Sequence, residues 1–146
     1  MATKKDKVIT FSIYRIETQQ YAVLREEIES EKLSFQAGFS FGVDGEAGFV
    51  RSTFVYVFLS DNEPALKLEV AIEFKIENEC FKSEIDKEKH WVIPKVFATH
   101  LAMVVVGAAR GILHEKTRGL ELNKFPMPAI NVVGTLKDDI IIEKAK

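Results

Sequence analysis

The feature that most constrains this chain is a stretch with no polar side chain, Leu101 to Ala109. It lies inside a longer helical pattern, Pro94 to Thr117, because proline suits the first turn of a helix and Gly119 suits its end. A helix that is apolar on every face is buried on every face. Since one sheet covers only one face, we expect a second copy of the chain to cover the other, which predicts a homo-oligomer, a dimer or a tetramer. The interface residues that we expect are Leu101, Val104, Val105, Ala108 and Ile112.

Four segments before this helix alternate apolar and polar residues, which is the period of a strand. The third segment is apolar on both faces and predicts an inner strand, whereas the long connection Gln19 to Lys32 favours a crossover rather than a simple hairpin. The sequence therefore predicts an α+β fold in which a four-stranded antiparallel sheet is followed by a long helix packed on it. The expected strands are Val8–Glu17, Leu33–Val43, Phe49–Leu59 and Leu66–Ile76.

The length of 146 residues fits one domain that can bury a core of its own. We expect a single domain over residues 1–146, with tails at 1–7 and at about 137–146. The last segment carries three isoleucines between charged residues, so an edge strand remains an alternative to a tail at that end.

The composition excludes several classes of partner. A net charge of −2 provides no electrostatic footprint for nucleic acid. The polar-free stretch is nine residues long, against the roughly 20 that cross a bilayer, so we expect no membrane insertion. Cys80 is the only cysteine and rules out a disulfide within the chain, and a basic N-terminus without an apolar run after it favours the cytoplasm.

No set of residues has the spacing of a catalytic or metal site. Gly42, Gly45 and Gly48 are three apart, but no Gly-Lys-Ser/Thr follows them, and a hairpin turn at Asp44-Gly45 explains them. The histidines at 100 and 114 are too far apart along one helix to share a metal. We therefore predict a protein without catalytic residues, metal or cofactor.

The aromatic residues favour an apolar groove instead. The chain holds eleven phenylalanines, and the prolines at 126 and 128 prevent full sheet pairing after the helix. An extended proline segment beside aromatic side chains is suited to form the wall of a groove that binds protein. The alternative is that these side chains only cap the core. We expect non-native client polypeptides to contact Phe35, Phe39, Trp91, Phe125 and Met127.

Three motifs resemble the SecB family of export chaperones. The segment Phe11-Ser-Ile-Tyr-Arg-Ile-Glu-Thr18 is similar to the family's first-strand pattern Phe-x-Ile-x-Arg-Ile-x-Thr. A weaker likeness lies at Glu69-Val70, and the order of four strands followed by a helix is also that of the family. The third motif runs from the helix into the proline segment, with matches at Ala109-Arg110, Arg118-Gly119, Phe125-Pro126, Pro128 and Asn131.

This resemblance implies a cytoplasmic homotetramer that acts as an ATP-independent holdase. Such proteins bind apolar segments of non-native polypeptides in protein export, where the SecA motor is the receptor. Relatives serve instead as chaperones of toxin–antitoxin systems. Two other functions remain alternatives on the residues alone: a non-catalytic oligomeric adaptor, and a carrier of a small apolar ligand.

The sequence departs from the family at the positions that dock on SecA. Gln20 and Leu24 stand where the family has acidic residues, although Glu69 matches a third acidic position. Docking on SecA is therefore not expected from these residues. The family's proline before the helical Ala-Arg is replaced in Val106-Gly107, which predicts a longer and straighter helix.

Overall fold

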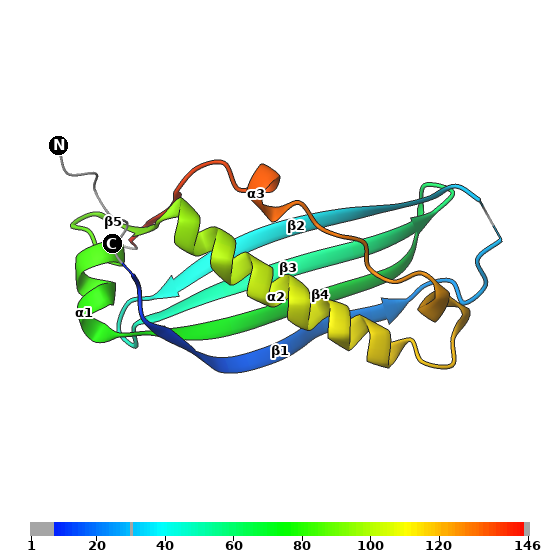
Figure 1. The fold of residues 1–146 in the computed structure, drawn as a ribbon, viewed down its shortest axis with the longest axis horizontal. Coiled ribbons are helices and arrows are strands. Elements are labelled where there is room, and N and C mark those ends of the chain that lie inside the picture. Colours follow the sequence, from blue (N-terminus) through cyan, green and yellow to red (C-terminus); the bar gives the residue numbers. More distant parts are fainter. Residues whose placement is uncertain (1–7, 30, 145–146) are drawn as a thin grey trace.

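A four-stranded antiparallel sheet and one long helix form the centre of the molecule (Figure 1). The structure is a computed structural model that describes residues 8–29 and 31–144. The strands lie in the order β1-β4-β3-β2, so β3 is an inner strand as predicted, and the α+β architecture is confirmed. Their bounds are Phe11–Val23 for β1, Leu33–Asp44 for β2, Phe49–Ser60 for β3 and Glu63–Ile76 for β4.

Two tight turns connect β2, β3 and β4. The predicted hairpin between β2 and β3 is present, and Gly48 in its turn has a φ of +73°, a conformation that glycine adopts without strain. The turn between β3 and β4 places Asp61 and Asn62 at φ values of 54° and 64°. Two consecutive residues with positive φ match the twist of a two-residue hairpin. These turns fix the register of the three strands.

The first strand is longer than the sequence predicted. β1 continues to Val23, whereas we expected a connection from Gln19 onward. Its pairing with β4 shifts register between Ile13 and Arg15, and again between Thr18 and Gln20. Each irregularity reverses the inward and outward alternation, so the period-two pattern is lost although the strand continues. Because β1 pairs with β4, the following residues pass around the end of the sheet to β2, and the predicted crossover is confirmed.

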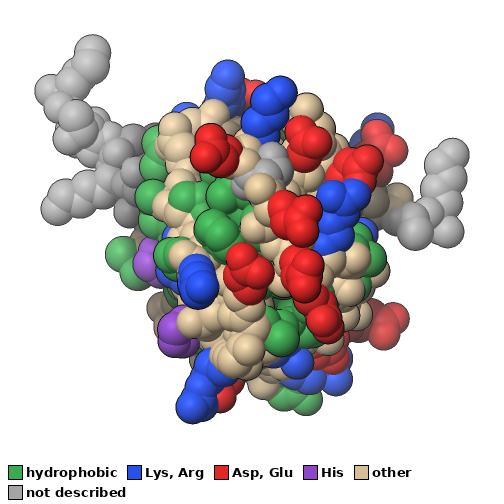
Figure 2. Space-filling model, turned by 90° about the vertical axis from the view of Figure 1, so that its right-hand side faces the viewer, with side chains coloured by type: hydrophobic (Ala, Val, Ile, Leu, Met, Phe, Trp, Pro, Cys, Tyr) green, Lys and Arg blue, Asp and Glu red, His purple; other side chains and the backbone are tan. Residues whose placement is uncertain are grey.

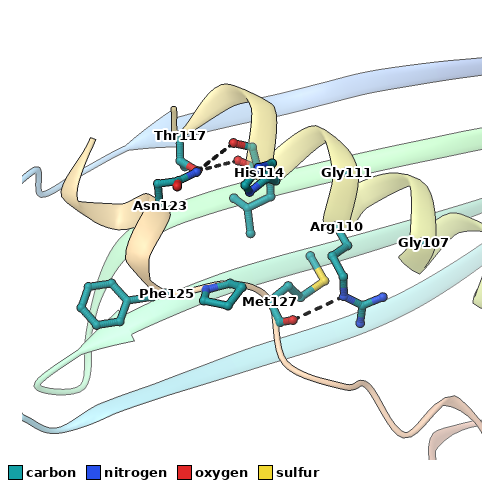
Figure 3. A pocket seen from close by; sticks show the side chains of 10 residues that line it. Gly107, Arg110, Gly111, His114, Thr117, Asn123, Phe125 and Met127 are labelled. Carbon is teal, nitrogen blue, oxygen red and sulfur yellow. Dashed lines mark hydrogen bonds between the residues drawn. The ribbon is translucent and has the colours of Figure 1, made fainter. Parts of the chain in front are cut away.

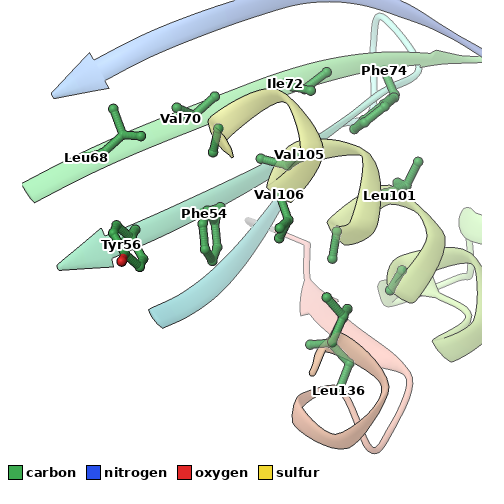
Figure 4. Close-up of a cluster of buried hydrophobic side chains, with 14 of the residues drawn as sticks. Phe54, Tyr56, Leu68, Val70, Ile72, Phe74, Leu101, Val105, Val106 and Leu136 are labelled. Carbon is green, nitrogen blue, oxygen red and sulfur yellow. The ribbon is translucent and has the colours of Figure 1, made fainter. Parts of the chain in front are cut away.

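Helix α2, Lys95–Lys116, lies across the two inner strands (Figures 1 and 4). Pro94 immediately precedes it, and the side chain of Asp139 accepts a hydrogen bond of 2.7 Å from the N–H of Lys95. After the helix, Gly119 takes a φ of +82°. The core forms where α2 meets β3 and β4. It includes Phe54, Tyr56, Val70, Ile72, Phe74, Leu101, Val105 and Val106 (Figure 4).

The helix is not covered on all sides within one chain. Leu101 and Val105 are fully buried against the sheet, so they belong to the chain's own core rather than to a surface open to a second copy. By contrast, Val104, Ala108 and Ile112 are half-buried, and 49% of Met103 is exposed. An interface on α2 would use this outward side. By length and composition alone α2 would also pass for a membrane span, although here one side of it packs on the sheet.

The remaining elements come before and after α2 in the chain, and α3 lies alongside it (Figure 1). The connection after β4 holds α1 (Asn78–Cys80), the helical turn η1 (Phe81–Ile85) and strand β5 (His90–Ile93). After α2 come the turn η2 (Glu121–Lys124), α3 (Val132–Thr135) and β6 (Ile140–Glu143). Of the two alternatives for residues 137–146, the edge strand is confirmed for Ile140–Glu143, where Ile140 to Ile142 pair with β5, and the tail is wrong there. The other expected tail, residues 1–7, lies outside the described residues.

Candidate binding groove

An extended segment that we call the strap, Phe125 to Asn131, runs back along α2 after the η2 turn (Figure 1). Pro126 and Pro128 have no N–H group to donate. Within the described chain, residues 126 to 129 make no backbone–backbone hydrogen bond. The strap is therefore extended but does not belong to either sheet.

Side chains hold the strap to the rest of the molecule. Met127 is only 4% exposed and belongs to the core, while the Phe125 ring stacks on Phe58 with 5.5 Å between ring centroids. From α2, Arg110 donates from Nε to the Met127 carbonyl at 3.3 Å and from Nη2 to the Pro128 carbonyl at 3.0 Å (Figure 3 shows the bond to Met127). The strap is thus held by the apolar packing of Met127 and Phe125 and by hydrogen bonds from the Arg110 guanidinium.

A first pocket, of about 430 Å³, lies between α2 and the strap (Figure 3). Its helical wall contains Gly107 and Gly111, where an added Cβ would meet nothing within 4 Å. At one end, Asn123 Nδ2 donates to the His114 carbonyl at 3.0 Å and to Thr117 Oγ1 at 3.1 Å. These bonds tie the start of the strap to the end of the helix. The lining also includes Leu113, Phe125, Pro126 and Met127.

A second pocket, of about 380 Å³, lies on the other side of the strap, against the ends of β2 and β3. Phe35 is 41% exposed there and stacks on Tyr56 with 5.9 Å between centroids. Tyr56 is 1% exposed, and burial raises its pKa to about 12, so its hydroxyl is neutral at physiological pH. The remaining lining residues are Leu33, Ser34, Phe58, Lys124, Phe125, Pro126 and Pro128.

The two pockets share Phe125 and Pro126, so they form one groove that the strap divides. We call this the binding groove. Its surface consists mainly of aromatic rings, aliphatic groups and proline, which bury apolar side chains without specifying a sequence. No three His, Cys, Asp or Glu side chains within 8–29 and 31–144 are grouped so that they would hold a metal ion.

Charged side chains surround the nearby end of the molecule (Figure 2). The connection from β1 to β2 exposes Glu26, Glu27, Glu29 and Glu31, and Arg25 forms an ion pair with Glu63 of β4. Apolar side chains are visible between these charges in Figure 2. An apolar surface rimmed by charge is typical of a binding site rather than of a buried core.

The structure brings together some of the predicted client-binding residues. Phe35 and Phe125 line the second pocket, and Phe125 and Met127 line the first. Phe39 lines neither, since its half-buried ring packs on Phe54 with 5.1 Å between centroids. Trp91 lies away from the groove, where its ring approaches the β2–β3 turn at Gly45 and the Lys144 ammonium. That these residues bind a client stays a prediction.

The groove residues that sequence reasoning missed include Tyr56, Phe58, Gly107 and Gly111. Tyr56 and Phe58 lie on the same sheet face as Phe35, because the register pairs Phe35 with Phe58. The Asp44-Gly45 turn sets this register, so pairing the residues of the two strands by their distance from the turn would have placed Tyr56 and Phe58 beside Phe35. The two glycines carried no signal, because only the strap's return path along α2 makes that side of the helix a pocket wall.

Comparison with known proteins gives a likeness of fold only. Scans against protein-family models and curated proteins found no match. Among solved structures, the Mycobacterium tuberculosis Rv1957 SecB-like chaperone, in complex with a ChAD peptide from the Rv1956 HigA1 antitoxin, matches with a TM-score of 0.51. It is 15% identical, and the match covers 82% of this chain and 90% of that one. This likeness supports a SecB-like fold.

A second solved structure is a protein of unknown function from Streptococcus agalactiae. It is 14% identical with a TM-score of 0.40, and the match covers 86% of this chain and 99% of that one.

Proposed function

We propose that this protein is a SecB-like chaperone that holds apolar segments of non-native polypeptides in the binding groove without using ATP. The observation that carries the proposal is the groove itself: two adjoining apolar pockets, separated by a strap that is not part of a sheet. The solved structure with the same fold is a chaperone with a bound peptide, which supports the same class of function. In this proposal the protein acts as a homo-oligomer in the cytoplasm.

Aggregation of a chemically denatured model protein tests this proposal. We expect the purified protein to slow aggregation, followed by light scattering, in buffer without nucleotide. Phe35→Ser and Phe125→Ser should weaken this protection, because each removes an aromatic ring from the second pocket. Ile141→Ser is the matched control, since Ile141 is 64% exposed on β6 and lines neither pocket. Equal protection by all three variants would contradict the groove as the client site.

For the pathway, we propose a chaperone of a toxin–antitoxin system in preference to protein export. The SecB-like solved structure carries a peptide from an antitoxin. In addition, Gln20 and Leu24 stand in β1 and just after it, where the resemblance would require acidic residues for docking on SecA. Co-purification from the native host decides between the two: an antitoxin recovered with the chaperone supports the proposal, and SecA recovered with it argues for export.

A purified sample also tests the small-ligand carrier. A lipid-like molecule that co-purifies in stoichiometric amount, seen by mass spectrometry, would favour the carrier over the chaperone.

A further inference from the structure

The position of the strap decides the width of both halves of the binding groove. Phe125 and Pro126 line the first pocket from one side and the second pocket from the other. A shift of the strap toward α2 would narrow the first pocket, and a shift toward β2 would narrow the second. Whatever holds the strap therefore controls what the groove accepts.

The backbone of the strap has few partners of its own. Its prolines remove two of the donors that a strand uses, so the strap cannot become a regular fifth strand beside β2. Asn131 accepts from the N–H of Gly134 and from the Thr135 hydroxyl, and both bonds remain inside α3 and its cap. They do not connect the strap to α2 or to the sheet.

Arg110 supplies the hydrogen bonds that tie the strap backbone to the helix. Its guanidinium reaches two successive carbonyls, those of Met127 and Pro128, with different nitrogens. Hydrogen bonds from a charged donor are stronger than those between neutral groups, and the planar guanidinium fixes direction as well as distance. Within the described chain, these are the hydrogen bonds found between α2 and residues 126 to 130.

We propose that Arg110 is a positioning residue of the binding groove: it holds the strap backbone against α2 and thereby fixes the width of both pockets. This inference rests on the proposed function. It assigns to Arg110 a role in how long a client stays bound, because a strap that moves away from α2 no longer encloses the client's side chains. Client capture depends on the exposed aromatic rings and should change little.

The test uses Arg110→Gln, which keeps most of the aliphatic stem and removes the charge and the forked donor. Arg118→Gln is the matched control, because Arg118 is an exposed arginine in the turn just after α2 and forms a local ion pair with Glu115. Arg110→Lys keeps the charge at a single donor centre and should give an intermediate result. Retained secondary structure and unfolding midpoints show that each variant is folded.

Two measurements are made on each variant. The first is the ¹³C-methyl NMR signal of Met127, with exposed Met103 on α2 as the internal reference. The second is the dissociation rate of a short synthetic peptide rich in Phe and Leu. For Arg110→Gln we expect the Met127 methyl to become more mobile while Met103 is unchanged. We also expect dissociation about tenfold faster, with an association rate close to that of the wild type.

Each contrary result overturns a defined part of the inference. An unchanged Met127 signal in Arg110→Gln means that Arg110 does not hold the strap. A mobile Met127 with unchanged peptide dissociation means that the strap's position does not govern binding. If the wild-type protein binds no apolar peptide, the proposed function and the role of Arg110 in it both fail, while the Met127 signal still decides whether Arg110 holds the strap.

Discussion

Ser52 shows how one residue in this core departs from the rule that buried polar groups are paired. It lies fully buried on the helix-facing side of β3, and its Oγ has no hydrogen-bond partner in the described chain. A buried hydroxyl without a partner costs about 1–3 kcal/mol. Its neighbours across the sheet, Phe41 and Ile72, offer no acceptor side chain.

We therefore expect Ser52→Ala to raise the free energy of unfolding by about 1 kcal/mol. Alanine removes the unpaired oxygen and keeps the Cβ that packs beneath α2. Urea unfolding followed by circular dichroism measures the difference. Ser40→Ala, at an exposed position on β2, should change the free energy of unfolding by less than about 0.5 kcal/mol. A destabilised Ser52→Ala protein would mean that the hydroxyl has a partner after all.

At the scale of the element, α2 contains glycines that its own packing does not require. Gly111 is exposed in the interior of the helix, and a Cβ there would meet nothing within 4 Å. Glycine costs a helix interior about 0.8–1.0 kcal/mol relative to alanine. We expect Gly111→Ala to stabilise the fold by that amount, measured as a higher midpoint of urea unfolding.

At Gly119, substitution by alanine should have the opposite effect on stability. Its φ of +82° strains any residue with a Cβ, although the space around it is also open. Gly119→Ala should therefore lower the unfolding midpoint while Gly111→Ala raises it. If both substitutions move the midpoint in the same direction, local backbone conformation does not govern the effect.

The sheet carries an ion-pair network on its face opposite α2. Arg15 and Glu17 lie on β1, Arg51 on β3 and Glu73 on β4, and four ion pairs of 2.8–3.3 Å connect the three strands. The hydrogen bond from Gln19, and then that from Arg51, hold the pKa of Glu17 below its usual value. The Glu73 carboxylate in turn raises the pKa of Arg15.

This network predicts how the free energy of unfolding depends on pH. A carboxyl whose pKa is lower when folded stabilises the fold above its unfolded pKa, and that contribution is lost as the pH falls through the folded pKa. Urea unfolding measured from neutral pH down to about pH 3 should therefore show a decline to which Glu17 contributes. Glu17→Gln should flatten the decline relative to the wild type and to Glu26→Gln, the comparison variant at an exposed glutamate of the connection. A decline of equal slope in both variants would exclude Glu17 as a source.

At the scale of the whole molecule, the outward side of α2 is the surface on which we expect assembly. Val104, Ala108 and Ile112 are half-buried, and the β1 residues Ile13 and Ile16 are each 50% exposed. Val104→Asp should dissociate the homo-oligomer and leave the chain folded. Val105→Asp should unfold it, because that position is fully buried in the single chain.

Size-exclusion chromatography with light scattering measures the mass of each protein, and circular dichroism reports its fold. Wild-type protein that is a stable monomer at micromolar concentration would contradict the expected assembly. A Val104→Asp protein with wild-type mass would place the interface elsewhere.

Much of the fold could be predicted because it follows from local patterns. β2 begins at Leu33 as predicted, and its alternation placed Phe35, Phe39 and Val43 on one face of the strand. The register confirms this, because it pairs them with Phe58, Phe54 and Val50, which share one face of β3. The irregularities near Tyr14 and Gln19 defeated the same reasoning in β1, because an inserted residue changes the face without changing composition. The pairing of β6 with β5 joins segments far apart in the chain, which no local pattern reports.

The candidate site divides in the same way. The sequence by itself determined that aromatic strand faces and a proline segment would be available, since period-two alternation and the missing N–H of proline are local properties. Only the tertiary structure decided that Phe35 and Phe125 share a pocket, that Trp91 does not join them, and that Arg110 binds the strap. The physical reason is that a groove forms between elements, and its position depends on the packing of α2 across the sheet and the return of the chain along it.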